Sequence, residues 1–281
     1  MKQRSGGTVK LSAREITKFR KAIYEYYNEH GRDLPWRGTR DPYYILVSEI
    51  MLQQTQVDRV IEKYTAFVQR FPDFRVLAES SFQDVLSVWQ GLGYNRRAGA
   101  LKRIGEIVTE KHKGELPADL GSLTALPGIG YNTACAILTY AFNEPVAFIE
   151  TNVRTVFMYF FFRDRERIRD SEILPLVEQT LDRKKPHAWY SALMDYGTML
   201  KKTHGSINPK SAHYQKQSPY KGSDRQIRGM VLKHLLQNSH SSRSDMTEIF
   251  GVEPDRLQRA LRSLEKEGFV RESRGVYSIA S

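Results

Sequence analysis

The apolar side chains of this sequence recur mainly at helical spacing. Near the start of the chain they return every three or four positions: Ile16, Phe19, Ile23, Tyr26 and Tyr27. Such spacing is typical of a helix with one face in a core, and Ser12 with Glu15 predicts a capping box where that helix begins. Residues 42–54, 60–112 and 131–141 continue the helical pattern. The sequence therefore predicts an all-α fold.

Glu49 interrupts one of the most apolar of these predicted helices. It stands between Val47 and Ile50, and carboxylates seldom lie in such surroundings unless they are paired or functional. One interpretation is an ion pair with an arginine such as Arg37. The other is a carboxyl group in a partly apolar pocket, where desolvation favours the neutral form and creates a candidate acid near neutral pH.

Residues 126–134 (LPGIGYNTA) predict a helix, a tight turn and a second helix. Pro127 ends the first helix because it has no N–H to donate, and Gly128 and Gly130 permit a tight turn and a close backbone approach. A helix that opens at residue 131 presents free N–H groups and the positive end of its dipole, which suits a phosphate. The same pattern is also typical of an ordinary packing hairpin.

A second carboxylate, Glu150, follows the apolar run 146–149 and precedes another predicted helix. Its structural interpretation is a cap for the free N–H groups of that helix. Asn152 stands two residues later and is a candidate to help hold the carboxylate. Both residues belong to a short motif, residues 148–154 (FIETNVR).

The charge of the chain indicates an anionic partner. The net charge is +11 and the isoelectric point is about 9.6, which favours nucleic acid. No apolar run approaches the roughly 20 residues of a membrane span, and no signal peptide is evident. Cys135 is the single cysteine, so we expect a packed thiol, no internal disulfide and a reducing compartment. We expect a cytoplasmic, nucleoid-associated protein of a prokaryote-like cell, without membrane contact.

Five motifs occur in one order: residues 34–37 (LPWR), 48–57 (SEIMLQQTQV), 91–94 (GLGY), 126–134 and 148–154. Together they resemble the helix-hairpin-helix (HhH-GPD) DNA glycosylase superfamily, and the MutY-type adenine glycosylases in particular. The resemblance extends over roughly residues 12–225. It implies a two-domain helical fold around a cleft, with residues 30–140 as a helical barrel carrying the hairpin and residues 1–29 plus 141–222 as the second domain.

The resemblance assigns catalytic roles to four residues. Glu49 is the expected acid, and Glu150 occupies the position of the family's central aspartate with one methylene more. Asn152 is expected to help hold Glu150. Asn132 stands where bifunctional relatives carry a nucleophilic lysine, and an amide cannot form a Schiff base. The resemblance therefore implies a monofunctional glycosylase.

The expected DNA contacts lie in three segments. The hairpin, with Gly128, Gly130, Tyr131 and Thr133, is expected to hold a phosphate and is a candidate site for a monovalent cation. Gln53 and Gln54 can probe base edges or fill the gap left by an extruded base, or they are simply polar caps. Tyr94 is either a wedge in the base stack or a core residue. Four cations are expected to make this face basic: Arg96, Arg97, Lys102 and Arg103.

The family usually holds an iron–sulfur cluster with four cysteines. The corresponding stretch, residues 201–214, contains His204 and His213 but no cysteine. We expect no iron–sulfur cluster, no other metal and no organic cofactor, with side-chain packing in place of the cluster. The expected partner is double-stranded DNA, bound by a monomer.

A third region follows a linker predicted at residues 215–224. Apolar positions predict three helices from residue 225 onward, and residues 268–271 and 276–279 are expected to pair as a wing. We interpret residues 225–281 as a winged helix-turn-helix, a unit that binds DNA in many proteins and serves protein contacts in others. The region is too short for the 8-oxoguanine-reading domain of a full MutY-type enzyme.

The resemblance predicts base excision by hydrolysis of an N-glycosidic bond. The expected base is a flipped adenine, mispaired or modified as in 6-methyladenine, with hypoxanthine as another candidate, and the product is an abasic site. Removal of thymine or uracil from mismatches is the second interpretation. The third is a non-catalytic DNA-binding regulator, for which Glu150 and Asn132 are the supporting departures from the family pattern.

Overall fold

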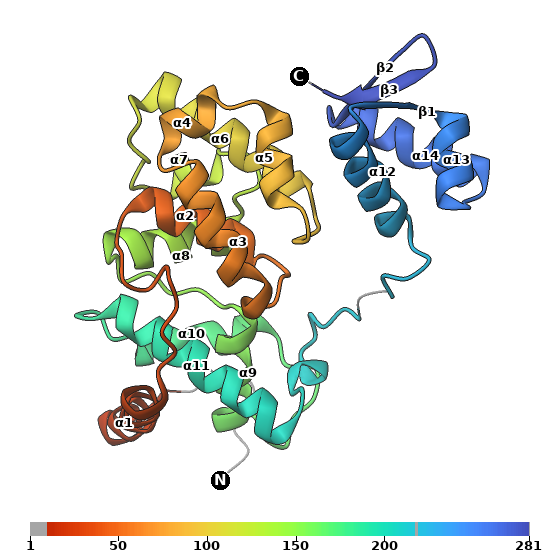
Figure 1. The fold of residues 1–281 in the computed structure, drawn as a ribbon. Helices are drawn as coiled ribbons and strands as arrows, with labels where there is room; N and C mark the ends of the chain where they lie inside the picture. The colour runs from red at the N-terminus through yellow and green to blue at the C-terminus, as the bar shows by residue number, and fades with distance from the viewer. Residues whose placement is uncertain (1–9, 217–218, 281) are drawn as a thin grey trace. The chain divides into compact units, whose positions relative to one another are not determined.

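The computed structural model describes residues 10–216 and 219–280 and is drawn as a ribbon in Figure 1. Residues 1–9 of the expected second domain, residues 217–218 of the expected linker and residue 281 lie outside the described parts. The α-helices are α1 (Ala13–His30), α2 (Pro42–Leu52), α3 (Val57–Arg70), α4 (Phe74–Glu79), α5 (Phe82–Trp89), α6 (Arg96–His112), α7 (Leu120–Thr124), α8 (Tyr131–Phe142), α9 (Thr151–Phe161), α10 (Asp170–Thr180), α11 (Pro186–His204), α12 (Asp224–Asn238), α13 (Arg243–Phe250) and α14 (Pro254–Lys266). The remaining elements are the 3₁₀-helix η1 (Asn208–Lys210) and the strands β1 (His240–Ser242), β2 (Val270–Ser273) and β3 (Val276–Ile279).

The chain divides into two compact units. Unit 1 comprises Met1–Glu49, Ala118–Ala125 and Ile129–Lys216, and unit 2 comprises Ile50–Pro117, Leu126–Gly128 and Gln217–Ser281. The mostly helical character predicted from the sequence is confirmed. The domain bounds expected from the sequence stay a prediction. No helix in the described parts of the chain has the length and apolar character needed to cross a membrane.

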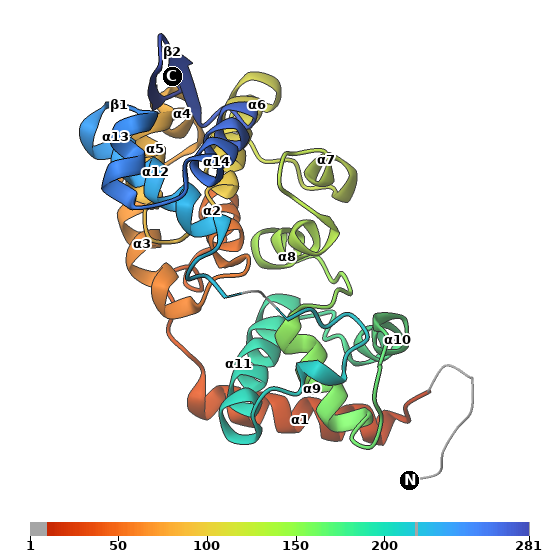
Figure 2. The same ribbon diagram turned by 90° about the vertical axis from the view of Figure 1, so that its right-hand side faces the viewer.

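Unit 1 is built around an aromatic core between α1, α9, α10 and α11. Phe19 of α1 meets Phe157 and Trp189 edge-on, with ring centroids 5.3 and 5.8 Å apart. Figure 2 shows α1 running beneath α9 and α11. The predicted capping box is confirmed, because Ser12 accepts from the backbone of Glu15 and the Glu15 side chain accepts from the backbone of Ser12. The capping box fixes where α1 begins, and Phe19 and Ile23 of the predicted core face are buried.

α9 and α11 approach each other closely at Gly197. A Cβ atom at this position would lie 2.7 Å from both the carbonyl oxygen and the Cβ of Asn152. No real Cβ tolerates such distances, so only glycine lets the first turn of α9 rest on α11. This contact fixes the segment that begins directly after Glu150.

Unit 2 contains the α3–α6 helices, whose apolar faces meet around Trp89. Its most connected polar residue is Arg97, which is only 8% exposed. Its guanidinium donates to the carbonyls of Ile50, Met51 and Gln53 at 2.6–3.0 Å, and also to the Thr55 hydroxyl and the Gly93 carbonyl. Burial lowers the pKa of Arg97 to about 10, so it stays charged at neutral pH and ties two turns together.

The C-terminal region of unit 2, α12 to β3, combines three helices with a sheet in the order β1-β3-β2. The predicted pairing of two C-terminal strands is confirmed, with Val270 opposite Ile279. β2 begins two residues later than expected because Gly268 has a positive φ of 73° and turns the chain. β1 was not predicted from the sequence. It is three residues long and polar, so it has no alternating apolar pattern.

Candidate active site

Glu49 lies in the last turn of α2 and is half-buried. The expected alternative, an ion pair with Arg37, is wrong. Arg37 instead donates to both carboxylate oxygens of Asp195, at 2.7 and 2.8 Å. Arg32 also donates to Asp195, at 2.6 Å. Although burial alone would raise the pKa of Asp195, these hydrogen bonds lower it. The carboxylate partner of Arg37 is therefore Asp195 and not Glu49.

Glu150 is the N-cap residue of α9, yet its side chain makes no capping hydrogen bond. Only its backbone carbonyl joins the helix, by accepting from the Arg154 N–H at 2.8 Å. The structural interpretation of this carboxylate as a cap is therefore wrong. The side chain is half-buried and remains available for another use.

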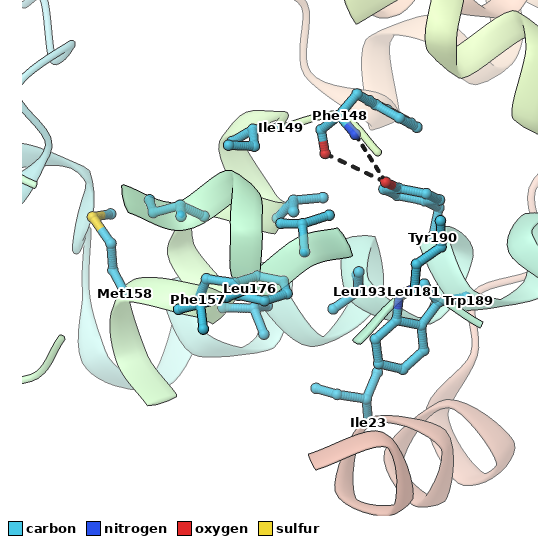
Figure 3. Packing of buried hydrophobic residues seen from close by; sticks show 14 of the residues in the cluster. Ile23, Phe148, Ile149, Phe157, Met158, Leu176, Leu181, Trp189, Tyr190 and Leu193 are labelled. Atoms are coloured by element: carbon cyan, nitrogen blue, oxygen red, sulfur yellow. Dashed lines mark hydrogen bonds between the residues drawn. The ribbon is translucent and has the colours of Figure 1, made fainter. Parts of the chain in front are cut away.

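The segment before Glu150 is fixed by side chains from two other helices. The Tyr190 hydroxyl of α11 accepts from the Phe148 N–H and donates to the Val146 carbonyl, each at 3.0 Å. Figure 3 shows its ring stacked on Phe148. Asn132 of α8 donates from Nδ2 to the Ile149 carbonyl at 3.1 Å. The residue immediately before Glu150 is therefore held by the amide that occupies the expected lysine position.

Glu49 and Glu150 lie close enough for the charge of one to change the pKa of the other. Burial, followed by repulsion from Glu150, raises the pKa of Glu49 well above its usual value. Burial raises the pKa of Glu150 to about 7, and the charge of Arg154 opposes that rise. Within the described residues, neither carboxyl has an ion-pair or hydrogen-bond partner for its side chain. Two uncompensated carboxyls in one neighbourhood disfavour double ionisation.

The two helix ends give these carboxyls different preferences. Glu150 precedes the first turn of α9, where the helix dipole stabilises an anion. Glu49 stands in the last turn of α2, where the dipole disfavours one. Arg154, whose guanidinium is held by Asp170 in two hydrogen bonds of 2.7 Å, adds to the preference of Glu150 for its charged form. A single negative charge on the pair therefore belongs on Glu150.

Tyr140 of α8 joins this pair and was missed by the sequence analysis. Burial, then the charges of Glu49 and Glu150, raise its pKa well above the usual value. Its ring meets His187 edge-on, with centroids 5.4 Å apart. The only signal in the sequence was a large hydroxylated side chain in a helix of mostly small residues. As a neutral phenol beside two carboxyls, Tyr140 can donate a hydrogen bond to an anion.

Asn152 has a different neighbour from the one expected. Its Cβ and backbone pack on Gly197, and no hydrogen bond joins its amide to Glu150 among residues 10–216 and 219–280. Asn152, the second residue of α9, therefore forms the contact between α9 and α11 at Gly197. The expected holding role of its amide stays a prediction.

The hairpin residues have distinct local geometries. Gly128 has a positive φ of 77°, and a Cβ there would lie 2.9 Å from the Ala100 Cβ, so the turn requires glycine. Gly130 has an ordinary φ of −88° as N-cap of α8, with open space at its Cα. Tyr131 is 53% exposed, and Thr133 is half-buried in the same first turn. The N-cap residue of α8 therefore has no side chain to accept a hydrogen bond from the first N–H groups of the helix.

Gln53 and Gln54 lie in the turn that Arg97 organises. The Gln53 amide donates to the Gly128 carbonyl at 3.3 Å. Gln54 is exposed and has a left-handed φ of 54°, an unusual backbone for a residue that is not glycine. Such strain often marks functional positions, and here it directs an amide side chain to the surface.

Tyr94 also has a left-handed φ, of 47°, but its hydroxyl accepts a hydrogen bond from Arg225 of α12 at 3.0 Å. Its ring faces the guanidinium groups of Arg97 and Arg225, 5.5 and 5.9 Å from the ring centroid. Tyr94 is therefore not an apolar core residue, and its role as a wedge in the base stack stays a prediction. It is the point where α12 contacts the turn before α6.

The basic face expected on α6 is largely wrong. Arg97 is buried, and Arg96 forms two hydrogen bonds with Glu267 at 2.6 and 2.9 Å. Lys102 and Arg103 both bind Glu106 at 2.8 Å. Three of the four expected cations thus have carboxylate partners, and the fourth binds carbonyls. Glu106 lies on α6 itself, three and four residues from Arg103 and Lys102, whereas the partners of Arg96 and Arg97 are distant in sequence.

An iron–sulfur cluster does not fit this chain. The single cysteine, Cys135, is buried inside α8 as expected. The His204 ring lies tilted against Tyr159, with centroids 5.2 Å apart, whereas His213 accepts from the Asp170 N–H at 3.3 Å. The described residues contain no group of three or more His, Cys, Asp or Glu side chains able to hold a metal. The expected lack of any cofactor, and a cation at the hairpin, stay predictions.

Comparison with known proteins agrees with the motifs. Residues 47–179 match the family described as HhH-GPD superfamily base excision DNA repair protein. The adenine DNA glycosylase of Mycolicibacterium smegmatis is 31% identical over 270 residues, which cover 89% of this chain and 92% of that protein. The chain therefore belongs to the HhH-GPD superfamily of base excision DNA repair proteins, in the branch of the adenine DNA glycosylases.

Two further relatives show how far the similarity extends. The adenine DNA glycosylase of Buchnera aphidicola subsp. Baizongia pistaciae is 34% identical over 187 residues, covering 65% of this chain. The chain spans about half of that relative's length, 52%. The solved structure of a thermostable thymine-DNA glycosylase matches with a TM-score of 0.58 and 27% identity, over 65% of this chain and 88% of that one.

Proposed function

We propose that this protein is a monofunctional DNA glycosylase that removes an adenine-type base from duplex DNA. The proposal is supported by its adenine glycosylase relatives, one of which it matches over 92% of that relative's length. The observation that carries it is the pair of half-buried carboxyls, Glu49 and Glu150, at helix ends of opposite polarity. Such a pair supplies an acid and an anion at the same pH.

In the proposed reaction, the target base leaves the stack and enters the site. Glu49, neutral because of its raised pKa, gives its proton to a ring nitrogen of the purine. The bond between C1′ and the base then breaks, and the neutral base departs. The charge of Glu150 stabilises the oxocarbenium-like sugar. Water adds to C1′ and returns a proton to Glu49, which leaves an abasic site and restores the enzyme.

Asn132 supports a reaction without strand cleavage. It has no amine to attack C1′, and its amide is used on the Ile149 carbonyl. The base is proposed to be adenine, mispaired or modified at its 6-position. Thymine or uracil is the second candidate, favoured by the structural similarity to a thymine-DNA glycosylase. A regulator without catalysis has no use for two carboxyls whose pKa values are both raised.

DNA contacts are proposed for the hairpin and the two glutamines. The open N-terminus of α8, with Gly130, Tyr131 and Thr133, suits a phosphate. Gln53 and the exposed Gln54 are proposed to contact the bases next to the extruded nucleotide. Tyr94 is proposed to join them on the DNA side, together with its partner Arg225.

The test is single-turnover excision on a panel of duplexes. The panel contains adenine opposite guanine and opposite 8-oxoguanine, 6-methyladenine opposite thymine, hypoxanthine, and thymine or uracil opposite guanine. Strand cleavage only after alkali establishes a monofunctional glycosylase and identifies its base. Glu49→Gln or Glu150→Gln should lower excision about 10²- to 10⁴-fold with DNA binding retained. Glu144→Gln, an exposed carboxyl near Glu150, is the matched control, and full activity of both site variants contradicts the proposal.

A further inference from the structure

The helix α14 has two sharply different faces. Leu257, Ala260, Leu261 and Leu264 are buried and form its core face. On the opposite side, Arg259, Arg262 and Lys266 follow one another at spacings of three and four residues and are all exposed, so they share one line of the helix. We call these three residues the cationic stripe.

The cationic stripe is not neutralised within the protein. Among the described residues, none of its three members has a carboxylate at ion-pair distance. Other arginines in this region are paired: Arg228 with Glu267 and Arg256 with Asp224, each at 2.7 Å. Asp255, one turn before Arg259, stands in the first turn of α14, where a negative charge suits the helix dipole. The stripe therefore presents three uncompensated positive charges to its surroundings.

A second group of cations lies on the neighbouring hairpin. Arg274 and Gly275 join β2 to β3 with positive φ angles of 53° and 78°, the geometry of a tight two-residue hairpin turn. Arg274 is exposed at the tip, and Arg271 is exposed on β2 with its Nε donating to the Ser278 hydroxyl at 3.2 Å. The β2–β3 hairpin thus carries a fourth cation at its tip and a fifth on its first strand.

α13 and α14 are consecutive helices joined by a short turn, which is the connectivity of a helix-turn-helix. Three residues, 251–253, connect the two helices (Figure 1), and the connection includes a glycine, as such turns often do. In DNA-binding helix-turn-helix units the second helix enters the major groove. Here the second helix is α14, and its outward line is the cationic stripe.

We propose that the cationic stripe and the hairpin arginines form a second duplex-DNA site, which binds the phosphate backbone whether or not a lesion is present. Among the described residues, α14 exposes no large hydrophobic side chain, whereas protein interfaces centre on apolar and aromatic anchors. This site is separate from the hairpin before α8 and needs no glycosidic bond. Its function is to hold the protein on undamaged DNA, so its affinity falls steeply with salt.

The test measures binding of the full chain to an undamaged duplex of about 30 base pairs by fluorescence anisotropy over a salt series. The variant carries Arg259→Ala, Arg262→Ala and Lys266→Ala. The matched control carries Lys18→Ala, Lys111→Ala and Lys233→Ala, three exposed cations outside both proposed DNA surfaces. Both triple variants lose the same charge and no core contact, and thermal melting checks that both are folded.

We expect the stripe variant to bind about 10- to 100-fold more weakly at low salt, with a salt slope smaller by about 2 to 3. The control should stay within about 2-fold of the parent. Single-turnover excision at saturating protein should be equal in all three. Equal binding by the stripe variant and the control overturns the proposal, as does an unchanged salt slope. Absence of excision on every duplex with stripe-dependent binding retained contradicts the glycosylase proposal and leaves this one standing.

Discussion

The two site carboxyls differ in what surrounds them, and this difference predicts a pH profile. Burial raises the pKa of Glu150 to about 7 against the charge of Arg154, and the proposed role of Glu150 needs the ionised form. The role of Glu49 needs the protonated form, which its raised pKa preserves. Excision should therefore rise as the pH increases through about 7 and fall where Glu49 loses its proton, giving a bell-shaped profile.

Arg154→Gln should move the acid limb of this profile to higher pH. Loss of the guanidinium removes the charge that lowers the pKa of Glu150, so less of the carboxyl is ionised at a given pH. We expect single-turnover excision to fall about 3- to 10-fold at pH 7 and to match the parent about 1 pH unit higher. The measurement is the excision rate between pH 5.5 and 9.5 on one substrate.

Arg165→Gln provides the control for Arg154, because Arg165 also pairs with a carboxylate, Glu172, at 2.6 Å. The Arg165 side chain is more exposed than that of Arg154, and the pKa of Glu150 is set by burial and by Arg154, not by Arg165. Its profile should coincide with that of the parent. A uniform loss of rate in Arg154→Gln at every pH would instead assign Arg154 a purely structural role.

At the scale of elements, the site depends on how α9 rests on α11. The three atoms nearest to a Cβ built at Gly197 all belong to Asn152, and Asn152 lies two residues after Glu150. A displacement of the α9 first turn therefore displaces the carboxylate directly. The packing at Gly197 therefore helps to set the position of the Glu150 carboxylate.

Gly197→Ala should lower both stability and excision. The added methyl group would lie 2.7 Å from the Asn152 carbonyl oxygen, so α9 must shift, at a cost of about 1 to 3 kcal/mol in the free energy of unfolding. Gly99→Ala on α6 is the control, since its nearest neighbour is an ordinary 3.6 Å away and alanine favours helix by up to about 1 kcal/mol. Urea denaturation and single-turnover excision of both variants decide the matter. Equal stability of the two would contradict the close approach.

Local patterns were enough to predict most of the helices. The capping box at Ser12 and the start of α2 at Pro42 each depend on residues within a few positions of one another. β1 has no such local signal, because its three polar residues form a strand only by pairing with β3. Local propensity and periodicity cannot report a pairing made across the sequence.

The candidate site was predictable only as far as its carboxyls. Glu49 stood out because it interrupts an apolar helix, and Glu150 because of the motif around it. The partners of the charged residues were not predictable, since Arg37 binds Asp195 across 158 positions and Tyr94 binds Arg225 across 131. Long-range partners also take up Arg96 and Arg97, two of the four cations expected to form a basic face on α6. Spacing along a chain identifies an unusual residue but not its tertiary partner.

At the scale of the whole molecule, Glu267 connects the C-terminal region to the rest of unit 2. It accepts from Arg96 of α6 and from Arg228 of α12, and the Ser263 hydroxyl donates to it at 2.8 Å. Nearby, Phe82 and Phe269 meet with ring centroids 5.3 Å apart. Hydrogen bonds from Arg96, against the effect of burial and with help from Arg228 and Ser263, lower the pKa of Glu267 to about 2.

Glu267→Gln should weaken this connection in a pH-dependent way. A carboxylate whose folded pKa is depressed stabilises the folded state above its unfolded pKa of about 4.3, and this contribution is lost as the pH falls toward 2. At pH 7 we expect a loss of about 1 to 3 kcal/mol from the charge-assisted hydrogen bonds, measured by urea denaturation. Proteolysis within residues 215–222 should also be faster.

The pH dependence separates this pairing from a generic effect of the substitution. Glu265→Gln is the control, because Glu265 is exposed near the end of α14, two residues before Glu267. The difference between the two variants should be largest at pH 7 and shrink below about pH 4, as Glu267 becomes protonated in the unfolded chain of the parent. A difference that is the same at pH 7 and pH 3.5 would mean that the side-chain shape of Glu267, and not its charge, holds the C-terminal region to α6.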